Sequence, residues 1–156
     1  MSVEAGLNPD FLDLLDAFAK AQVEFIVVGA HALAAHGVVR ATGDLDVWVR
    51  PSAENATRVV TGLTAFGAPL AQHGVSATDF AKVGTVYQMG LPPRRIDVLT
   101  QISGVEFAEA WADRTFVTVR GTPTAFLGRE ALLRNKRAAA RPKDLVDVDL
   151  LERHRP

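Results

Sequence analysis

Residues 44–49 place the strongest limit on the fold of this 156-residue chain, because they read DLDVWV. Aliphatic β-branched and aromatic residues favour a strand, in which successive side chains point to opposite faces. Asp44, Asp46 and Trp48 then share one face, and the three aliphatic residues share the other. Two ionised carboxylates this close repel each other, and folding alone does not require them. The segment therefore predicts a strand and, between its two aspartates, a positively charged group that removes the repulsion.

Helical and strand patterns alternate along the rest of the chain. Residues 8–10 supply an N-cap, an N1 proline and an early acid, and apolar residues at helical spacing follow to about residue 22. Residues 67–83 predict a loop with one helical turn. The order of elements is typical of an α/β fold, a mixed β-sheet flanked by helices and followed by a C-terminal helical pair. Helices are predicted at 9–22, 30–37, 51–66, 105–111, 129–140 and 142–154, and strands at 23–29, 45–50, 85–91, 94–100, 115–121 and 122–127.

Length and composition predict one domain, residues 1–156, with the 48% apolar and 22% charged content of an ordinary globular protein. The formal net charge of −1 provides no overall basic field for nucleic acid or membranes. The chain has no cysteine, which excludes disulfides and zinc–thiolate sites. No apolar run is long enough to cross a membrane, and the acidic start lacks the positive region of a signal peptide. We therefore expect a cytoplasmic protein.

Charge is unevenly distributed despite the small net value. Residues 129–155 contain eight Lys or Arg and five Asp or Glu, whereas residues 1–24 contain one Lys and five Asp or Glu. This asymmetry predicts a basic C-terminal segment.

A strand that ends at Gly29 and runs into a helix predicts an anion site. Gly29 lets the backbone approach a phosphate closely. The free N–H groups of Ala30, His31 and Ala32, together with the helix dipole, favour negative charge there. The alternative is an ordinary strand–glycine–helix turn that binds nothing.

A third carboxylate, Asp97, lies between two β-branched residues in the strand pattern RRIDVLT. A buried acid is costly unless it is paired or bound to a metal. Carboxylates from neighbouring strands suit Mg²⁺, a hard ion that prefers oxygen ligands and completes its shell with substrate phosphates. Two alternatives need no metal: Asp97 pairs with Arg94 or Arg95, and Asp44 caps a turn after Gly43.

Arg40 and Thr42 precede the paired aspartates and are candidates to hold phosphate or to order the loop. An arginine presents a planar fork that fits phosphate oxygens, although an exposed arginine can equally be only solvated. His31 and His36 lie five residues apart on a predicted helix and diverge, and no acid lies nearby at ligand spacing. Zinc is therefore not expected.

In combination these motifs resemble the polymerase-β-like nucleotidyltransferase superfamily, and more closely its small bacterial AbiEii-type or minimal nucleotidyltransferase group. The segment VGAHALAAHGVVRATGDLDVWV is similar to that group's glycine turn and Arg-x-Thr-x-Asp-x-Asp pattern. The segments RIDVLTQISGVEFAEAW and LLRNKRAAARPKDLVDVDLL resemble its later blocks, so the likeness covers about residues 23–152. One position departs from the pattern: Ala30 stands where the group usually has Gly or Ser, so no hydroxyl is available for the terminal phosphate.

The resemblance implies a Mg²⁺- or Mn²⁺-dependent nucleotidyltransferase that moves a nucleoside monophosphate from a nucleoside triphosphate such as ATP to an acceptor hydroxyl. The acceptor would be tRNA or a protein, and the protein would act within a toxin–antitoxin pair. Asp44, Asp46 and Asp97 would be catalytic and would bind the metal, with Asp97 drawing the proton from the acceptor. The C-terminal helices, residues 129–153, would be an appended substrate-side element. The nucleotide would be bound by Gly29, Ala30, His31, Arg40, Thr42, Lys136, Lys143 and Asp144.

Two other functions remain open. The first is a non-catalytic relative that uses the fold as a binding module, as an antitoxin or nucleotide sensor; the altered turn at Ala30 favours it and the three aspartates oppose it. The second is an antibiotic nucleotidyltransferase with an aminoglycoside or lincosamide acceptor. It ranks last, because the chain shows no acidic insertion that would bind a cationic drug.

Overall fold

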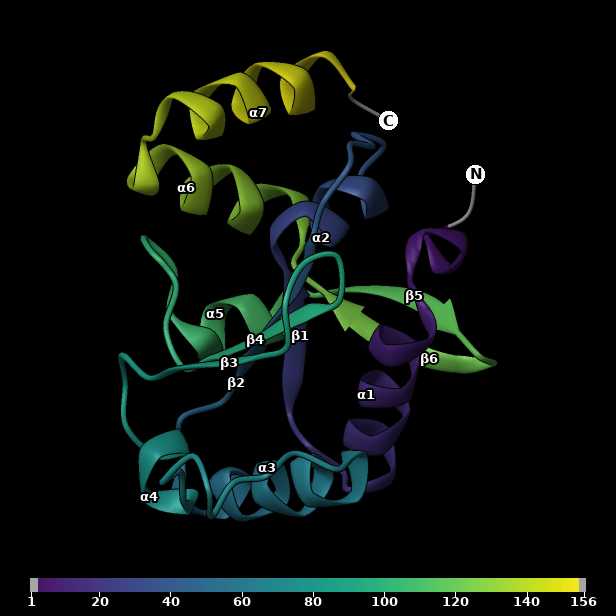
Figure 1. Cartoon of the computed structure of the whole chain (residues 1–156). Helices are drawn as coiled ribbons and strands as arrows, with labels where there is room; N and C mark the ends of the chain where they lie inside the picture. Colours follow the sequence, from purple (N-terminus) through teal and green to yellow (C-terminus); the bar gives the residue numbers. More distant parts are fainter. Residues whose placement is uncertain (1–2, 155–156) are drawn as a thin grey trace.

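A computed structural model describes residues 3–154, and at its centre those residues form a six-stranded mixed sheet with the order β3-β4-β2-β1-β6-β5 (Figure 1). In the middle of the sheet, β2 pairs antiparallel with β1 and parallel with β4. The α/β class and the mixed sheet predicted from the sequence are confirmed. The strands are β1 (Phe25–Val28), β2 (Asp44–Val49), β3 (Val86–Met89), β4 (Arg95–Leu99), β5 (Thr115–Val119) and β6 (Thr122–Phe126).

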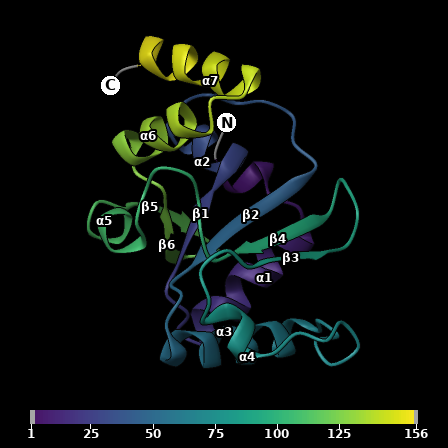
Figure 2. The ribbon, with the colours of Figure 1, turned by 90° about the vertical axis from the view of Figure 1, so that its left-hand side faces the viewer.

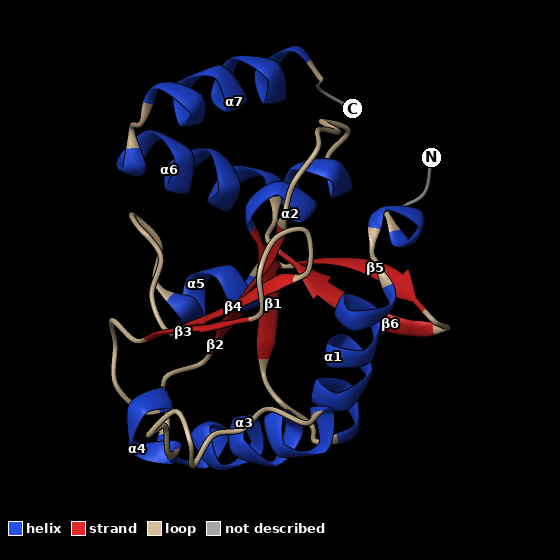
Figure 3. Cartoon of the chain, viewed as in Figure 1, coloured by secondary structure: helices blue, strands red, loops and turns tan. Residues whose placement is uncertain are grey.

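Helices flank the sheet, and two of them follow the last strand as expected (Figure 3). In both ribbon views the last two helices lie together at one end of the molecule, opposite α3 and α4 (Figure 2). The helix α4 is the helical turn expected within residues 67–83. The helices are η1 (Glu4–Gly6, 3₁₀), α1 (Pro9–Lys20), α2 (Gly29–Ala35), α3 (Ala53–Phe66), α4 (Ala77–Phe80), α5 (Phe107–Ala112), α6 (Arg129–Ala139) and α7 (Pro142–Arg153).

The alternation of side chains along β2 separates two hydrophobic cores. Leu45, Val47 and Val49 point into the core formed with α1 and α3, and all three are fully buried. Trp48 points to the opposite face, into the core formed with α2, α5 and α6. Asp46 lies on the same face as Trp48, two residues closer to the start of the strand. The sheet therefore buries both faces around Trp48 and leaves the aspartates beyond the edge of the second core.

Two boundaries differ from the predicted ones around β1. The strand begins at Phe25 instead of residue 23, because the Val23 N–H donates to the Phe18 carbonyl (3.0 Å) and so belongs to the end of α1. At the other end, Gly29 has φ of +71° and is already the first residue of α2. A positive φ is compatible with glycine and interrupts a strand. Among residues 3–154, no helix has the length and apolar character needed to cross a membrane.

Candidate functional site

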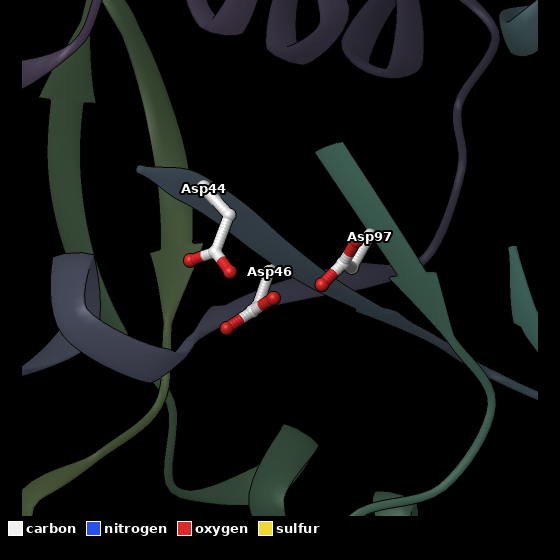
Figure 4. Close-up of side chains that lie close together, drawn as sticks. All are labelled: Asp44, Asp46 and Asp97. Carbon is white, nitrogen blue, oxygen red and sulfur yellow. The ribbon is translucent and has the colours of Figure 1, made fainter. Parts of the chain in front are cut away.

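Three carboxylates meet on one face of the sheet because of the register between β2 and β4. These strands are parallel, and Asp46 lies directly opposite Asp97. Asp44 precedes Asp46 by two residues and so shares its face. One oxygen from each of the three side chains lies within 4.8 Å of the others, and all three point to a common space (Figure 4). The three aspartates singled out in the sequence are thus brought together by two neighbouring strands.

Gly29 contacts the carboxylate cluster at Asp46, and it follows β1, the strand that flanks β2 on the side opposite β4. The antiparallel register of β1 and β2 sets Val28 opposite Asp46, so the chain turns into α2 beside that carboxylate. A Cβ atom at Gly29 would come within 2.4 Å of Asp46 Oδ2, far inside van der Waals contact. Space and backbone conformation both demand glycine at this position, since φ is +71°. The turn holds Asp46 close to the start of α2.

Arg95 supplies the positive charge found among the three carboxylates. It lies opposite Asp44 in the β2–β4 register, and its side chain contacts Asp44 Oδ2 at 2.5 Å. It also reaches both oxygens of Asp97 at 3.2 Å. Arg94 instead pairs with Asp10 on α1, away from the site. Of the two arginines considered as partners for Asp97, Arg95 is therefore the one that pairs with it, and it pairs with Asp44 as well.

Asp46 has no ion pair with Lys or Arg within the described part of the chain. Burial raises the pKa of Asp46 to about 7, and the charges of Asp44 and Asp97 and a hydrogen bond with Asp97 act in the same direction. The charge of Arg95 lowers it only in part. The three carboxylates of the cluster thus face a single cation of the chain, Arg95, and their mutual repulsion together with burial favours the protonated form of Asp46.

Thr42 orders the carboxylate of Asp44 from the preceding loop. The hydroxyl of Thr42 donates to Asp44 Oδ1 at 3.1 Å and accepts the Asp44 backbone N–H at 3.4 Å. Thr42 and Arg95 therefore contact different oxygens of the same carboxylate. The role expected for Thr42 in ordering the loop fits this geometry. The Asp44 carboxylate accepts from the side chains of Thr42 and Arg95, rather than from a backbone N–H of a turn after Gly43.

The turn at Gly29 lines the cleft above the carboxylates together with Ala30, but the His31 side chain does not. His31 is 5% exposed and packs edge-to-face on Phe11 of α1, with ring centroids 5.6 Å apart. Burial lowers the pKa of His31, opposed by the Asp44 charge and backbone.

Buried charges from the α6–α7 pair form a second group beside the cleft. Lys136 is 5% exposed, and its Nζ lies 3.4 Å from Asp144 and 3.2 Å from Asp147. Arg40 joins the group from the loop before β2, at 2.6 Å from Asp147. Arg141 pairs with Asp144 at 2.6 Å. This network ties the segment around Arg40 to α7 across 107 positions of sequence.

Asp144 belongs to this network and also caps the N-terminus of its own helix, α7. One of its oxygens accepts the Arg141 backbone N–H, which completes a capping box at the start of α7. Burial alone raises the pKa of Asp144, but the hydrogen bond from Arg141 and the charge of Lys136 hold the net pKa below its ordinary value. Asp147 was not predicted as a site residue. Its spacing of three residues from Asp144 on a helix was the available signal.

The three aspartates and the cations Arg40, Arg95, Lys136 and Arg141 line one cleft of about 1450 Å³, whereas the fully buried Asp144 and Asp147 do not line it. Ligand pockets in proteins commonly measure about 300–1,000 Å³, so this cleft has room for more than one small ligand. Lys143 is exposed at the cleft wall and, within the described residues, takes part in no ion pair. The other cations of the wall are all paired with acids: Arg40, Arg95, Lys136 and Arg141.

The donor set fits a hard divalent cation. All three groups are carboxylates, which Mg²⁺ and Mn²⁺ prefer, and no softer ligand lies among them. The elevated pKa of Asp46 indicates that the carboxylates outnumber the cations supplied by the chain. Comparison of the chain with models of known protein families and with curated proteins found no match in either case.

Proposed function

We propose that this protein is a Mg²⁺- or Mn²⁺-dependent nucleotidyltransferase. The observation that carries the proposal is the approach of Asp44, Asp46 and Asp97, whose oxygens gather within 4.8 Å at the wall of a cleft large enough for two substrates. These three residues would hold the metal. Bound there, it would supply charge neutralisation for the attacking and leaving oxygens of a phosphoryl displacement.

The reaction joins an acceptor hydroxyl to the α-phosphate of a nucleoside triphosphate. The acceptor oxygen forms a bond to the α-phosphorus, and the bond from that phosphorus to the bridging oxygen breaks. Pyrophosphate leaves with the bonding electron pair, and Asp97 accepts the proton of the acceptor hydroxyl. Asp97 suits this role because β4 sets it directly opposite Asp46 at the cleft, where it is only 6% exposed. Asp is among the side chains that act as general bases when they are positioned beside the reacting group.

The residues around the carboxylates suit the triphosphate. Lys143 is the cleft cation with no acidic partner in the described residues, which makes it the best candidate to contact phosphate oxygens. Arg40 is held by Asp147 and half-exposed in the cleft, so it can present its remaining N–H groups. Lys136 forms ion pairs with both Asp144 and Asp147. We therefore assign Lys136 and Asp144 to holding α6 and α7 in position beside the nucleotide.

The acceptor is a hydroxyl on tRNA or on a partner protein, and we place the activity in the cytoplasm, within a toxin–antitoxin pair. The basic surplus of the C-terminal helices supports RNA less than its residue count suggests. Within residues 129–153 of the structure, the following basic residues are already in ion pairs with acids: Arg129, Arg134, Lys136, Arg137, Arg141 and Arg153.

A non-catalytic nucleotide-binding module is the second candidate. The contacts of Arg95 with Asp44 and Asp97 favour it, because an internal cation at these oxygens competes with a metal. Ala30 in the cleft wall also lacks a hydroxyl for the terminal phosphate. Asp46 argues for the enzyme, because its raised pKa shows that Arg95 leaves the cluster under-neutralised.

Transfer of label decides between the two. The purified protein is incubated with each α-labelled nucleoside triphosphate, Mg²⁺, and either total RNA or a cell lysate, with Asp46→Asn as the matched control. We expect label on RNA or on a protein with the wild type and none with the variant. Metal-dependent nucleotide binding without any transfer would establish the binding module. If tRNA is labelled, its affinity should fall with salt at a log–log slope of roughly −0.7 to −0.9 per phosphate contact.

A further inference from the structure

Arg95 contacts two of the three carboxylates that would hold the metal in the proposed function, Asp44 and Asp97. It faces Asp44 from the neighbouring strand and bridges Asp44 and Asp97, while its own side chain stays 32% exposed at the cleft. We propose that Arg95 is a resident counter-ion that moves from the carboxylates to the triphosphate when the metal binds. Metal and nucleotide binding then depend on each other. This inference rests on the proposed nucleotidyltransferase site and names how that site is regulated.

Competition follows from which oxygens Arg95 contacts. Both carboxylate oxygens of Asp97 lie 3.2 Å from nitrogens of the guanidinium, so a cation that binds either oxygen meets the positive charge of Arg95 at close range. Asp97 Oδ1 has no hydrogen bond of good geometry within the described residues. This oxygen is therefore held by charge alone and is the easier one to release.

Asp44 has a second hydrogen-bond partner, Thr42, which can hold its carboxylate when Arg95 leaves. Thr42 holds Oδ1 at 3.1 Å, and Arg95 holds Oδ2 at 2.5 Å. When Arg95 withdraws, Asp44 stays oriented by Thr42 and exposes the vacated oxygen. Asp44 therefore keeps its orientation without the arginine.

The exchange is unfavourable in free energy mainly for the arginine, because a guanidinium that loses two carboxylate partners needs another anion. Metal alone supplies none, since it adds further positive charge. A nucleoside triphosphate supplies several oxygens, and the planar fork of arginine fits phosphate in a bidentate manner. Arg95 lines the same cleft as Lys143, so both cations face the space in which the triphosphate would lie. Nucleotide thus stabilises the state in which the metal site is open.

The neighbouring Arg94 provides a matched control. It differs from Arg95 by one position in the chain, pairs with Asp10 across the surface, and does not line the cleft. Substituting either arginine by glutamine removes the same charge from the same part of the chain. Only Arg95→Gln removes the cation from the carboxylates.

The experiment measures Mg²⁺ binding by calorimetry, with and without a saturating non-hydrolysable ATP analogue, for wild type, Arg95→Gln, Arg95→Lys and Arg94→Gln. We expect Arg95→Gln to bind Mg²⁺ alone about tenfold more tightly than wild type, and the gain in affinity caused by the analogue to shrink by about tenfold. Arg94→Gln should match wild type. Arg95→Lys should fall between, because one ammonium group cannot bridge two carboxylates as a fork does.

Arginine side-chain NMR adds a readout that is independent of the variants' stability. In wild type, the Arg95 Nε–H resonance should shift when Mg²⁺ and the analogue are both present. An unmoved resonance at saturation, or an unchanged ratio of affinities in Arg95→Gln and Arg95→Lys, would overturn the exchange while leaving the proposed function intact. A wild-type protein that binds neither Mg²⁺ nor the analogue would overturn both.

Discussion

Asp46 of β2 lies directly opposite Asp97 of β4, with both carboxylates on the same face of the sheet. Parallel pairing of two strands brings these acids together although 51 residues separate them in the chain. The arrangement places three carboxylates against one arginine, and burial together with the charges of Asp44 and Asp97 raises the pKa of Asp46 to about 7.

The double substitution Asp44→Asn with Asp46→Asn should abolish metal-dependent nucleotide binding, because two of the three candidate ligands lose their charge. Calorimetry with ATP, with and without Mg²⁺, measures this directly. Wild type should bind ATP more tightly in the presence of Mg²⁺, whereas the double variant should show one affinity under both conditions. Equal affinities with and without metal in wild type would exclude the carboxylates as a metal site.

The pH dependence of stability should carry the signature of Asp46. In the metal-free folded protein this group keeps its proton up to about pH 7, whereas in the unfolded chain it releases it near 3.8. The folded state therefore binds more protons in this window, so the Asp46 contribution to the free energy of unfolding falls as pH rises from about 3.8 to about 7 and is level above.

Asp46→Asn removes that contribution and should raise the melting temperature at pH 8 by at least about 3 °C, with a smaller gain at pH 4. Mg²⁺ should raise the melting temperature of wild type by linkage and leave that of the variant nearly unchanged. Scanning calorimetry at both pH values provides the measurement. A variant less stable than wild type at pH 8 would mean that the Asp46 carboxylate stabilises the metal-free fold.

Gly29→Ala should destabilise the fold and weaken metal binding, because the new Cβ would lie 2.4 Å from Asp46 Oδ2. Gly121 offers a matched control, since its φ of +77° is similar to the +71° of Gly29 and nothing lies within 4 Å of a Cβ there. Gly121→Ala measures the backbone strain alone, about 1–2 kcal/mol. We expect Gly29→Ala to cost more by chemical denaturation and, unlike Gly121→Ala, to reduce Mg²⁺ affinity. Equal effects of the two substitutions would show that Asp46 simply moves aside.

Lys136 and Lys143 should separate into a structural and a ligand-binding residue. Lys136→Ala leaves Asp144 and Asp147 with one partner fewer in a buried site, and should cost about 1–3 kcal/mol in urea denaturation. Lys143→Ala removes an exposed side chain and should leave stability within about 0.5 kcal/mol while lowering ATP affinity. A stable Lys136→Ala protein that fails to bind ATP would return Lys136 to the phosphate-binding group.

Much of the site follows from local rules that act along the chain. The period of two in DLDVWV sets Asp44, Asp46 and Trp48 on one face, and β2 has this alternation in the structure. The tight turn at Gly29 follows from glycine's access to positive φ. Backbone conformation and the alternation of faces depend on neighbours in sequence, so a pattern of residues is enough to predict them.

Long-range packing decides the rest, because register and burial arise from contacts that no local pattern encodes. The meeting of Asp97 with Asp46 requires β4 to pair parallel with β2 in one register, and a shift by one residue would turn Asp97 away. Which arginine pairs with Asp97 depends on the same register. The family resemblance implies that Lys136 binds the nucleotide, yet packing of α6 on α7 buries it between two acids. Packing thus pairs the basic residues of α6 with acids, because only packing brings these opposite charges within reach of each other. Among the described cations that line the cleft, it leaves Lys143 without an ion pair.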